Sequence, residues 1–283
     1  MKNHLLLTIA GILALTATVQ AQNLFVSDIS GNIYDFTPGG ARSTFASGLN
    51  EPEGLAFNSA GDLFEADLLG GNIYEYTPGE VRSTFASGLD QPLGLAFNSA
   101  GNLFEADSQS GNIYEFTPGG VRSTFASGLS GPEGLAFNSA GNLFEADIAS
   151  GNIYEFTPGG VRSTFASGLS YPLGLAFNSA GNLFETDWGT GSIYEFTPGG
   201  VRSTFASGLN QDNGMAFDST GDLFVADYGS GNIYEFTPGG AKSTFASGLS
   251  GPEGLAFQSV PEPSMWAILG MSVVALFGLR HKK

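Results

Sequence analysis

Four oxygen-bearing residues recur at one position of a repeated sequence, each directly before a glycine. They are Glu53, Glu133, Asn213 and Glu253, and they are separated by multiples of forty residues. Carboxylate and amide oxygens are the ligands that hard divalent cations such as Ca²⁺ prefer. Around a common axis these residues would form a ring, so the sequence predicts a candidate site for Ca²⁺ or another divalent cation. The alternative is a set of solvated carboxylates, because the other two members of the ring are Leu93 and Leu173.

A second candidate site is aromatic. Tyr171, Trp188 and Tyr228 lie in segments where the repeats differ, close in sequence to Gln211 and Asp212. Flat rings beside amides and carboxylates can stack on sugar rings and hydrogen-bond to their hydroxyls, so this group predicts a polysaccharide-binding surface. The alternative is that the rings only pack at the boundary between two repeats. We assign no catalytic residue.

Composition excludes several other kinds of chemistry. The two histidines, His4 and His281, lie outside the repeats, and cysteine is absent, so Ser-His-Asp and Cys-His nucleophiles cannot be built. The chain has 10 basic residues against 27 acidic ones, which predicts no nucleic-acid partner. An enzyme made from these repeats would have to use carboxylates and a metal ion.

The elements that must position these residues follow from the forty-residue period. Each unit contains four short runs of β-forming residues separated by turn signals, and none has a helical pattern. In one unit they are 94–97, 103–107, 112–117 and 121–126. The strand Gly-Leu-Ala-Phe or its variant begins six times, at Gly54, Gly94, Gly134, Gly174, Gly214 and Gly254.

Six four-stranded units arranged radially predict an all-β, six-bladed β-propeller over residues 22–259. The chain enters this region with a second-strand sequence, Asn23 to Asp28, and leaves it with an unpartnered first strand, Gly254 to Gln258. We therefore expect one C-terminal strand to join three N-terminal strands in a single blade. This would close the ring and protect both ends from fraying. We expect a monomeric propeller.

Two turns in each unit have nearly constant sequences. Asn98-Ser-Ala-Gly101 and Thr117-Pro-Gly-Gly120 predict tight hairpins, and Pro followed by Gly favours a type II turn in the second. Pairing Thr117 with Gly120 would place Glu115 opposite Arg122. The same arithmetic pairs Asp35 with Arg42, Glu75 with Arg82 and Glu235 with Lys242. We interpret these exposed pairs as devices for register and solubility.

The repeats differ mainly in two places, the linker before the first strand and the loop between the second and third strands. In an up-and-down blade both connections lie on the same face. Loops on a rigid scaffold often carry recognition, so the variable face is the expected ligand face. The alternative is that tight turns simply tolerate less drift than longer loops.

The repeat phrase at 92–107, Pro-x-Gly-Leu-Ala-Phe-x-Ser-x-Gly-Asn-Leu-Phe-x-Ala-Asp, is followed by Gly-Asn-Ile-Tyr-Glu-Phe. This phrase resembles the NHL-repeat propellers and their relatives in the regucalcin and gluconolactonase superfamily. The resemblance implies the propeller fold. In those relatives an Asn or Asp before such a glycine helps to bind a metal ion, and Asn213 and Glu253 resemble these positions. It therefore implies a second functional hypothesis, a metal-dependent hydrolase of the lactonase type.

Both ends of the chain read as targeting segments. Residues 1–21 combine a short polar start, an apolar run and small residues before Gln22, which predicts a secretory signal peptide. In residues 260–283, Val260 is followed by Pro261, Glu262 and Pro263, then by an apolar run predicted to form a hydrophobic helix, and finally by a basic cluster that starts at Arg280. An ordinary C-terminal membrane anchor is one interpretation of this tail.

That order, Pro-Glu-Pro, apolar segment and basic cluster, resembles the PEP-CTERM sorting signal of Gram-negative bacteria. The resemblance implies recognition by an exosortase, transient anchoring in the inner membrane, and a final location in the cell envelope, on the outer surface or outside the cell. Members of that family are often linked to exopolysaccharide. Our first functional hypothesis is thus an exported, envelope-associated binding or matrix module for polysaccharide.

Overall fold

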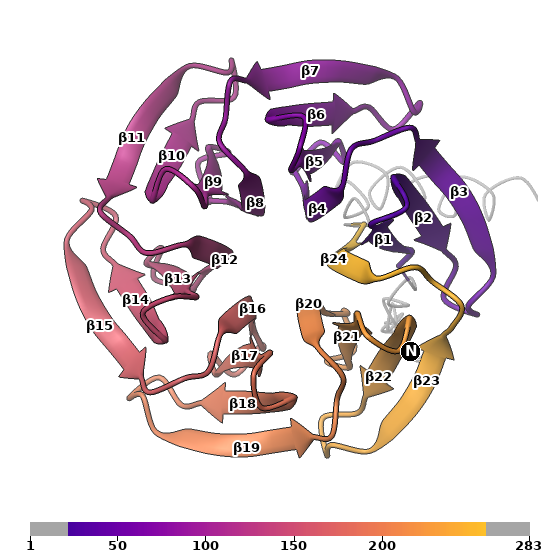
Figure 1. The fold of residues 1–283 in the computed structure, drawn as a ribbon, viewed down its shortest axis with the longest axis vertical. Coiled ribbons are helices and arrows are strands. Elements are labelled where there is room, and N and C mark those ends of the chain that lie inside the picture. The colour runs from indigo at the N-terminus through magenta and orange to yellow at the C-terminus, as the bar shows by residue number, and fades with distance from the viewer. Residues whose placement is uncertain (1–21, 259–283) are drawn as a thin grey trace, which may run out of the picture.

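The computed structural model describes residues 22–258, which form 24 strands in six four-stranded antiparallel sheets around a central axis (Figure 1). Within this range there is no helix, and so none that is long and apolar enough to cross a membrane. The all-β six-bladed propeller is thereby confirmed. The predicted signal peptide at 1–21 and the predicted hydrophobic helix within 260–283 lie outside the described residues.

The blades are numbered in chain order, and their strands are given from the axis outwards. Blade 1 contains β24 (Pro252–Phe257), β1 (Leu24–Asp28), β2 (Asn32–Phe36) and β3 (Arg42–Ser47). Blade 2 contains β4 (Pro52–Phe57), β5 (Leu63–Asp67), β6 (Asn72–Tyr76) and β7 (Arg82–Ser87), and blade 3 contains β8 (Pro92–Phe97), β9 (Leu103–Asp107), β10 (Asn112–Phe116) and β11 (Arg122–Ser127). Blade 4 contains β12 (Pro132–Phe137), β13 (Leu143–Asp147), β14 (Asn152–Phe156) and β15 (Arg162–Ser167). Blade 5 contains β16 (Pro172–Phe177), β17 (Leu183–Asp187), β18 (Ser192–Phe196) and β19 (Arg202–Ser207), and blade 6 contains β20 (Asp212–Phe217), β21 (Leu223–Asp227), β22 (Asn232–Phe236) and β23 (Lys242–Ala246).

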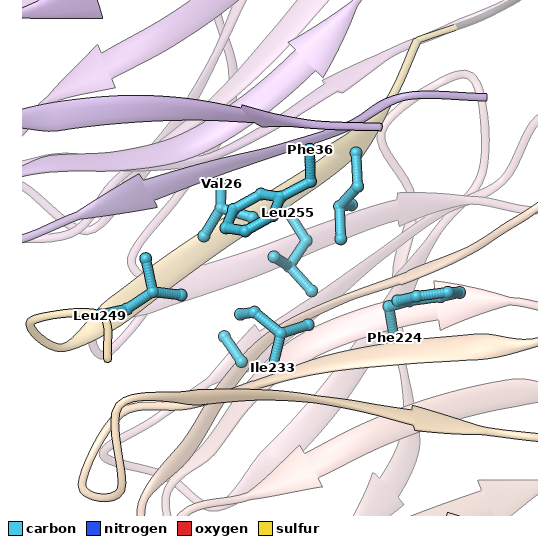
Figure 2. Packing of buried hydrophobic residues seen from close by; sticks show 8 residues of the cluster. Val26, Phe36, Phe224, Ile233, Leu249 and Leu255 are labelled. Atoms are coloured by element: carbon cyan, nitrogen blue, oxygen red, sulfur yellow. The ribbon is translucent and has the colours of Figure 1, made fainter. Parts of the chain in front are cut away.

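The ring closes within blade 1, as the sequence predicts. Strand β24, yellow in Figure 1, lies beside the indigo β1 and pairs with it antiparallel, with Leu24 opposite Phe257. Figure 2 shows the resulting packing, in which Val26 and Leu255 of blade 1 lie in one buried cluster with Phe224 and Ile233 of blade 6. Burying such side chains stabilises the fold by roughly 1.5–3 kcal/mol each, so the two ends of the propeller are held together by core packing.

Phenylalanine packs every junction between blades. In the first junction the ring of Phe25 meets those of Phe45 and Phe57 edge-on, with both centroid distances 5.1 Å. The other five junctions repeat this three-ring arrangement with centroid distances of 5.0 Å. Edge-to-face aromatic pairs contribute roughly 0.5–1.5 kcal/mol beyond their burial, so these triads hold the blades in a fixed relation.

The first-strand glycines allow neighbouring blades to approach closely at the axis. A Cβ atom placed on Gly134 would lie 2.1 Å from the carbonyl oxygen of Leu173 in the next blade. The equivalent glycines of the other blades make the same close approach, at 2.1–2.4 Å. No side chain fits there, which explains why glycine occupies this position in all six units.

The register of the outer hairpins differs from the sequence prediction. Gly120, rather than Gly119, has a left-handed φ of 77°, its N–H donates to the Thr117 carbonyl, and the Thr117 N–H donates to Val121. This is a type I turn followed by a left-handed bulge residue, so pairing shifts by one residue and Glu115 faces Ser123. The predicted pairing of Glu115 with Arg122 is therefore wrong.

The same shift overturns the other three predicted charge pairs. Asp35, Glu75 and Glu235 each face a serine, and the basic residue lies opposite the aromatic residue that ends the neighbouring strand. The basic side chains cover tyrosine rings instead, with the Arg122 guanidinium carbon 4.9 Å from the centroid of Tyr114. A cation over an aromatic face contributes about 0.5–1 kcal/mol at exposed sites.

The two variable segments of each blade lie side by side on one face. In blade 2 the N–H of Leu68 donates to the carbonyl of Glu51, joining the loop after β5 to the linker before β4. The buried Asp67 carboxylate also bridges them, accepting from the N–H groups of Asn50 at 3.0 Å and Gly70 at 2.9 Å. We call this the variable face, and we call the opposite face, which carries the two constant turns, the uniform face.

Candidate functional site

The innermost strand of each blade begins at the variable face, and its second residue points to the axis. The structure therefore brings Glu53, Glu133 and Asn213 together around a small cavity of about 80 Å³, whose wall is completed by Leu93, Leu173 and the first-strand glycines. Glu253 belongs to the same ring, because the side-chain amide of Asn213 donates a hydrogen bond to its carboxyl group. The sequence-predicted ring thus exists as a spatial arrangement.

Electrostatics in this ring favour the protonated acids. Burial, followed by repulsion from Glu51, raises the pKa of Glu53 to about 8. Burial, followed by repulsion from Glu53 and Glu133, raises the pKa of Glu253 to about 10. The pKa of Glu133 is also raised well above its usual range, mainly by burial. At neutral pH these shifts favour the protonated forms of Glu53 and Glu253.

A cation would need these oxygens to converge. Among residues 22–258, no three His, Cys, Asp or Glu side chains are grouped so that they could hold a metal ion. The Glu253 oxygen that accepts from Asn213 is already engaged, and Leu93 and Leu173 interrupt the ring. The predicted Ca²⁺ site therefore stays a prediction.

The predicted aromatic group divides into two parts. Tyr171 and Trp188 form an edge-on pair in blade 5, with centroids 5.7 Å apart at an interplanar angle of 81°. Both rings are accessible, with 52% of Tyr171 and 39% of Trp188 exposed on the variable face. Tyr228 lies elsewhere, against Gly251 and Ile29 at the junction of blades 6 and 1.

The polar partners predicted for these rings come from the linker of blade 6. Gln211 has a left-handed φ of 62°, and its carbonyl accepts the Tyr228 N–H at 3.1 Å. Asp212 begins β20, where its backbone pairs with Asp227. In each unit the residue equivalent to Gln211 accepts a backbone hydrogen bond from the loop of its own blade, so Gln211 is positioned in the same way as its equivalents.

A set of buried glutamates escaped the sequence reasoning. Glu65, Glu105 and Glu145 are 0% exposed, and within the described chain their carboxyl oxygens have no hydrogen-bond partner. Burial raises the pKa of Glu65 to about 9 and raises those of Glu105 and Glu145 well above their usual range. The sequence does carry a signal for them, because Val26 and Val225 occupy the same position in blades 1 and 6.

The comparison with family models concerns the C-terminal tail. The segment that follows the propeller matches the model described as the PEP-CTERM protein-sorting motif. Residues 259–283 carry a PEP-CTERM sorting motif. This motif indicates an exported protein with a C-terminal sorting signal that is processed by exosortase-type machinery. The predicted sorting residues Pro261, Glu262, Pro263 and Arg280 fall within it, outside the residues that the structure describes.

Solved structures with a similar fold include three informative neighbours. A chain of a nidogen/laminin complex aligns with 21% identity and a TM-score of 0.78, covering 85% of this chain and 99% of its own. Virginiamycin B lyase from Staphylococcus aureus aligns with 16% identity and a TM-score of 0.66, covering 86% and 93%. A protein proposed to be a gluconolactonase aligns with 17% identity and a TM-score of 0.65, covering 73% and 81%.

These neighbours have different functions at low identity, so their similarity establishes the propeller fold alone. No curated protein matches the sequence. The PEP-CTERM propeller must therefore be assigned a function from its own residues.

Proposed function

We propose that this PEP-CTERM propeller is an envelope-associated binding module whose ligand is exopolysaccharide. The observation that carries the proposal is the Tyr171 and Trp188 pair, two large aromatic side chains left 52% and 39% exposed on the variable face. Aromatic rings that remain accessible offer flat apolar surfaces on which the C–H face of a sugar can stack. The sorting motif supports a location where such polymers occur.

The surroundings of the pair suit a polar ligand. The backbone N–H of Trp188 donates to the backbone carbonyl of Tyr171, and Tyr171 itself has a left-handed φ of 59°. The backbone of both residues is therefore fixed by the fold. At equivalent positions in other blades, the loop residue lies against the linker of the following blade, as Tyr228 does against Gly251. Gln211 lies in the linker of the following blade, and its side-chain amide can donate to and accept from sugar hydroxyls.

Affinity electrophoresis through gels that contain purified polysaccharides tests this proposal. We expect at least one neutral polymer to retard the protein, and we expect a Trp188→Ala variant to lose most of that retardation. Val121→Ala is the matched control, because Val121 is 68% exposed but lies beside the constant outer turn on the uniform face. Equal retardation of both variants would contradict a role for the aromatic pair.

A lactonase-type hydrolase is the second candidate, and it depends on the acids at the channel. The observation that favours this hydrolase is geometric, because Glu53, Glu133 and Asn213 surround one cavity on the axis. Calorimetric titration with Ca²⁺ tests it directly. Heat of binding that disappears in a Glu53→Gln, Glu253→Gln double variant would favour the hydrolase, whereas a titration without heat would remove it.

The sorting step can be tested separately from binding. We propose that exosortase-type machinery recognises the tail and that the propeller is delivered to the outer surface after transient anchoring in the inner membrane. Replacing Pro261, Glu262 and Pro263 together by alanine should leave the tail attached, which mass spectrometry of the exported chain would detect. An unchanged mass distribution would contradict recognition of this motif.

A further inference from the structure

The uniform face carries pockets at three junctions between neighbouring blades. The pocket between blades 1 and 2 has a volume of about 190 Å³, that between blades 5 and 6 about 180 Å³, and that between blades 6 and 1 about 120 Å³. All three are bordered by residues of the constant turns, for example Pro78, Pro238 and Pro38. Because the turns recur in every unit, these three pockets are formed by equivalent residues of the repeat.

The lining of the pockets is built by the packing that holds the blades together. The pocket between blades 1 and 2 is lined by Phe45 and Phe57. The rings of both residues pack edge-on against the buried ring of Phe25, with centroid distances of 5.1 Å. The same three-ring arrangement occurs at all six junctions. The aromatic surface is therefore rigid and nearly identical around the ring.

A carboxylate lies at each of these pockets. Asp35, Glu195 and Glu235 line the three pockets in turn, and each comes from the third strand of its blade. The amide of Asn182 fixes Glu195 by donating to its Oε1 at 2.7 Å. Asp35 accepts from Asn23 through Oδ2, while its buried Oδ1 has no partner within residues 22–258.

The size, lining and charge of the pockets define the ligand class. Volumes of 120–190 Å³ are below the roughly 300–1,000 Å³ of pockets for drug-sized molecules, so one sugar ring is the appropriate scale. An aromatic wall beside a carboxylate suits a sugar that carries a protonated amine. The chain has a net charge of −17, which disfavours polymers rich in uronic acid or sulfate.

We propose that the inter-blade pockets of the uniform face are repeated subsites for single amino-sugar units of a cationic polysaccharide. A polymer with repeating units can occupy several equivalent pockets at once, so weak single contacts add up through high effective concentration. This inference rests on the proposed polysaccharide-binding function, but it places the contacts on the face opposite Trp188. It also gives the uniformity of the six units a functional consequence.

Isothermal titration of the purified protein with a short oligomer of glucosamine tests the inference. We expect more than one oligomer to bind per chain, with unchanged stoichiometry in Trp188→Ala. A variant that replaces the three pocket carboxylates and the carboxylates at the same position of the other three blades should bind at least tenfold more weakly. Its substitutions are Asp35→Asn, Glu75→Gln, Glu115→Gln, Glu155→Gln, Glu195→Gln and Glu235→Gln. The single variant Asp35→Asn provides a milder second test, with fewer tight sites expected per chain.

The controls separate this inference from the proposed function. Glu51→Gln removes a carboxylate from the variable face and should leave the titration unchanged. Binding of one oligomer per chain that is lost in Trp188→Ala would overturn the repeated subsites and support the aromatic pair. Equal affinity for a neutral glucose oligomer would overturn the assignment to amino sugars. Absence of binding to every polysaccharide would overturn both proposals.

Discussion

Replacing Glu65 by glutamine should remove the part of the pH-dependent loss of stability that comes from this buried carboxyl group. The Glu65 carboxyl group is 0% exposed and has no hydrogen-bond partner in the described chain. Burial raises its pKa from 4.5 to about 9. The folded protein therefore keeps this proton at neutral pH, whereas the unfolded chain releases it. By linkage, the free energy of unfolding falls as pH rises from about 4.5 and levels off above about 9.

The size of the effect follows from the pH interval. Each pH unit in this range costs about 1.4 kcal/mol per group, so the change from pH 5 to pH 8 amounts to about 4 kcal/mol as an upper limit. Glutamine has nearly the same shape and no proton to lose, so the variant should avoid this cost. Glu105 and Glu145 occupy the same position in blades 3 and 4 and add to the dependence in the wild-type protein.

Urea unfolding followed by circular dichroism at pH 5 and pH 8 measures this difference. Glu65→Gln should gain stability relative to wild type at pH 8 and little at pH 5. Glu65→Val is a second variant, because Val26 and Val225 show that valine fits this position in other blades. Glu80→Gln is the control, since it removes an exposed carboxylate from the same blade. Parallel pH dependences of wild type and Glu65→Gln would refute the reasoning.

Three further predictions concern how the ring is assembled. Gly134→Ala should destabilise the protein by about 3 kcal/mol or more in thermal unfolding, because its Cβ would lie 2.1 Å from a carbonyl oxygen of the next blade; Gly39→Ala, with nothing within 4 Å, should be nearly neutral. Ser27→Ala should cost about 1 kcal/mol, since the buried Ser27 hydroxyl donates to the Glu53 carbonyl at 2.6 Å; the exposed Ser43→Ala serves as control, and equal losses would contradict this role. Ending the chain after residue 251 removes β24 and should abolish cooperative unfolding, whereas ending it after residue 258 should preserve it.

The repeat allowed the architecture to be predicted, because each strand recurs with the same turn signals and only a ring pairs the two incomplete ends. The strand at Gly254 has no hairpin partner after it, and the entry strand at Asn23 has no first strand before it. In the structure these two strands, β24 and β1, pair with each other. The ring of residues before the first-strand glycines followed from the same symmetry. Its acid chemistry did not, because burial in a cavity of about 80 Å³ changes the charge state of Glu53 and Glu253.

The outer-hairpin register could not be predicted because two turn types accept the same residues. Both a type II turn and a type I turn with a left-handed bulge suit Pro-Gly-Gly, and they differ by one residue in pairing. The buried glutamates were missed for another reason. A second strand such as β5 is covered by neighbouring blades on both faces, so every residue of Leu63–Asp67 is buried. The usual alternation of buried and exposed residues along a strand would place Glu65 on an exposed face, and it therefore did not indicate that this side chain is buried.

A crystal structure of the protein with a bound glucosamine oligomer tests the central claim most directly, because that claim is the binding of polysaccharide by a propeller with repeated sites. The account predicts intact sugar rings in two or more inter-blade pockets of the uniform face, with an amine near Asp35 or Glu195. Sugar found only in the channel beside Glu53 and Glu253, or cleaved there, would contradict it.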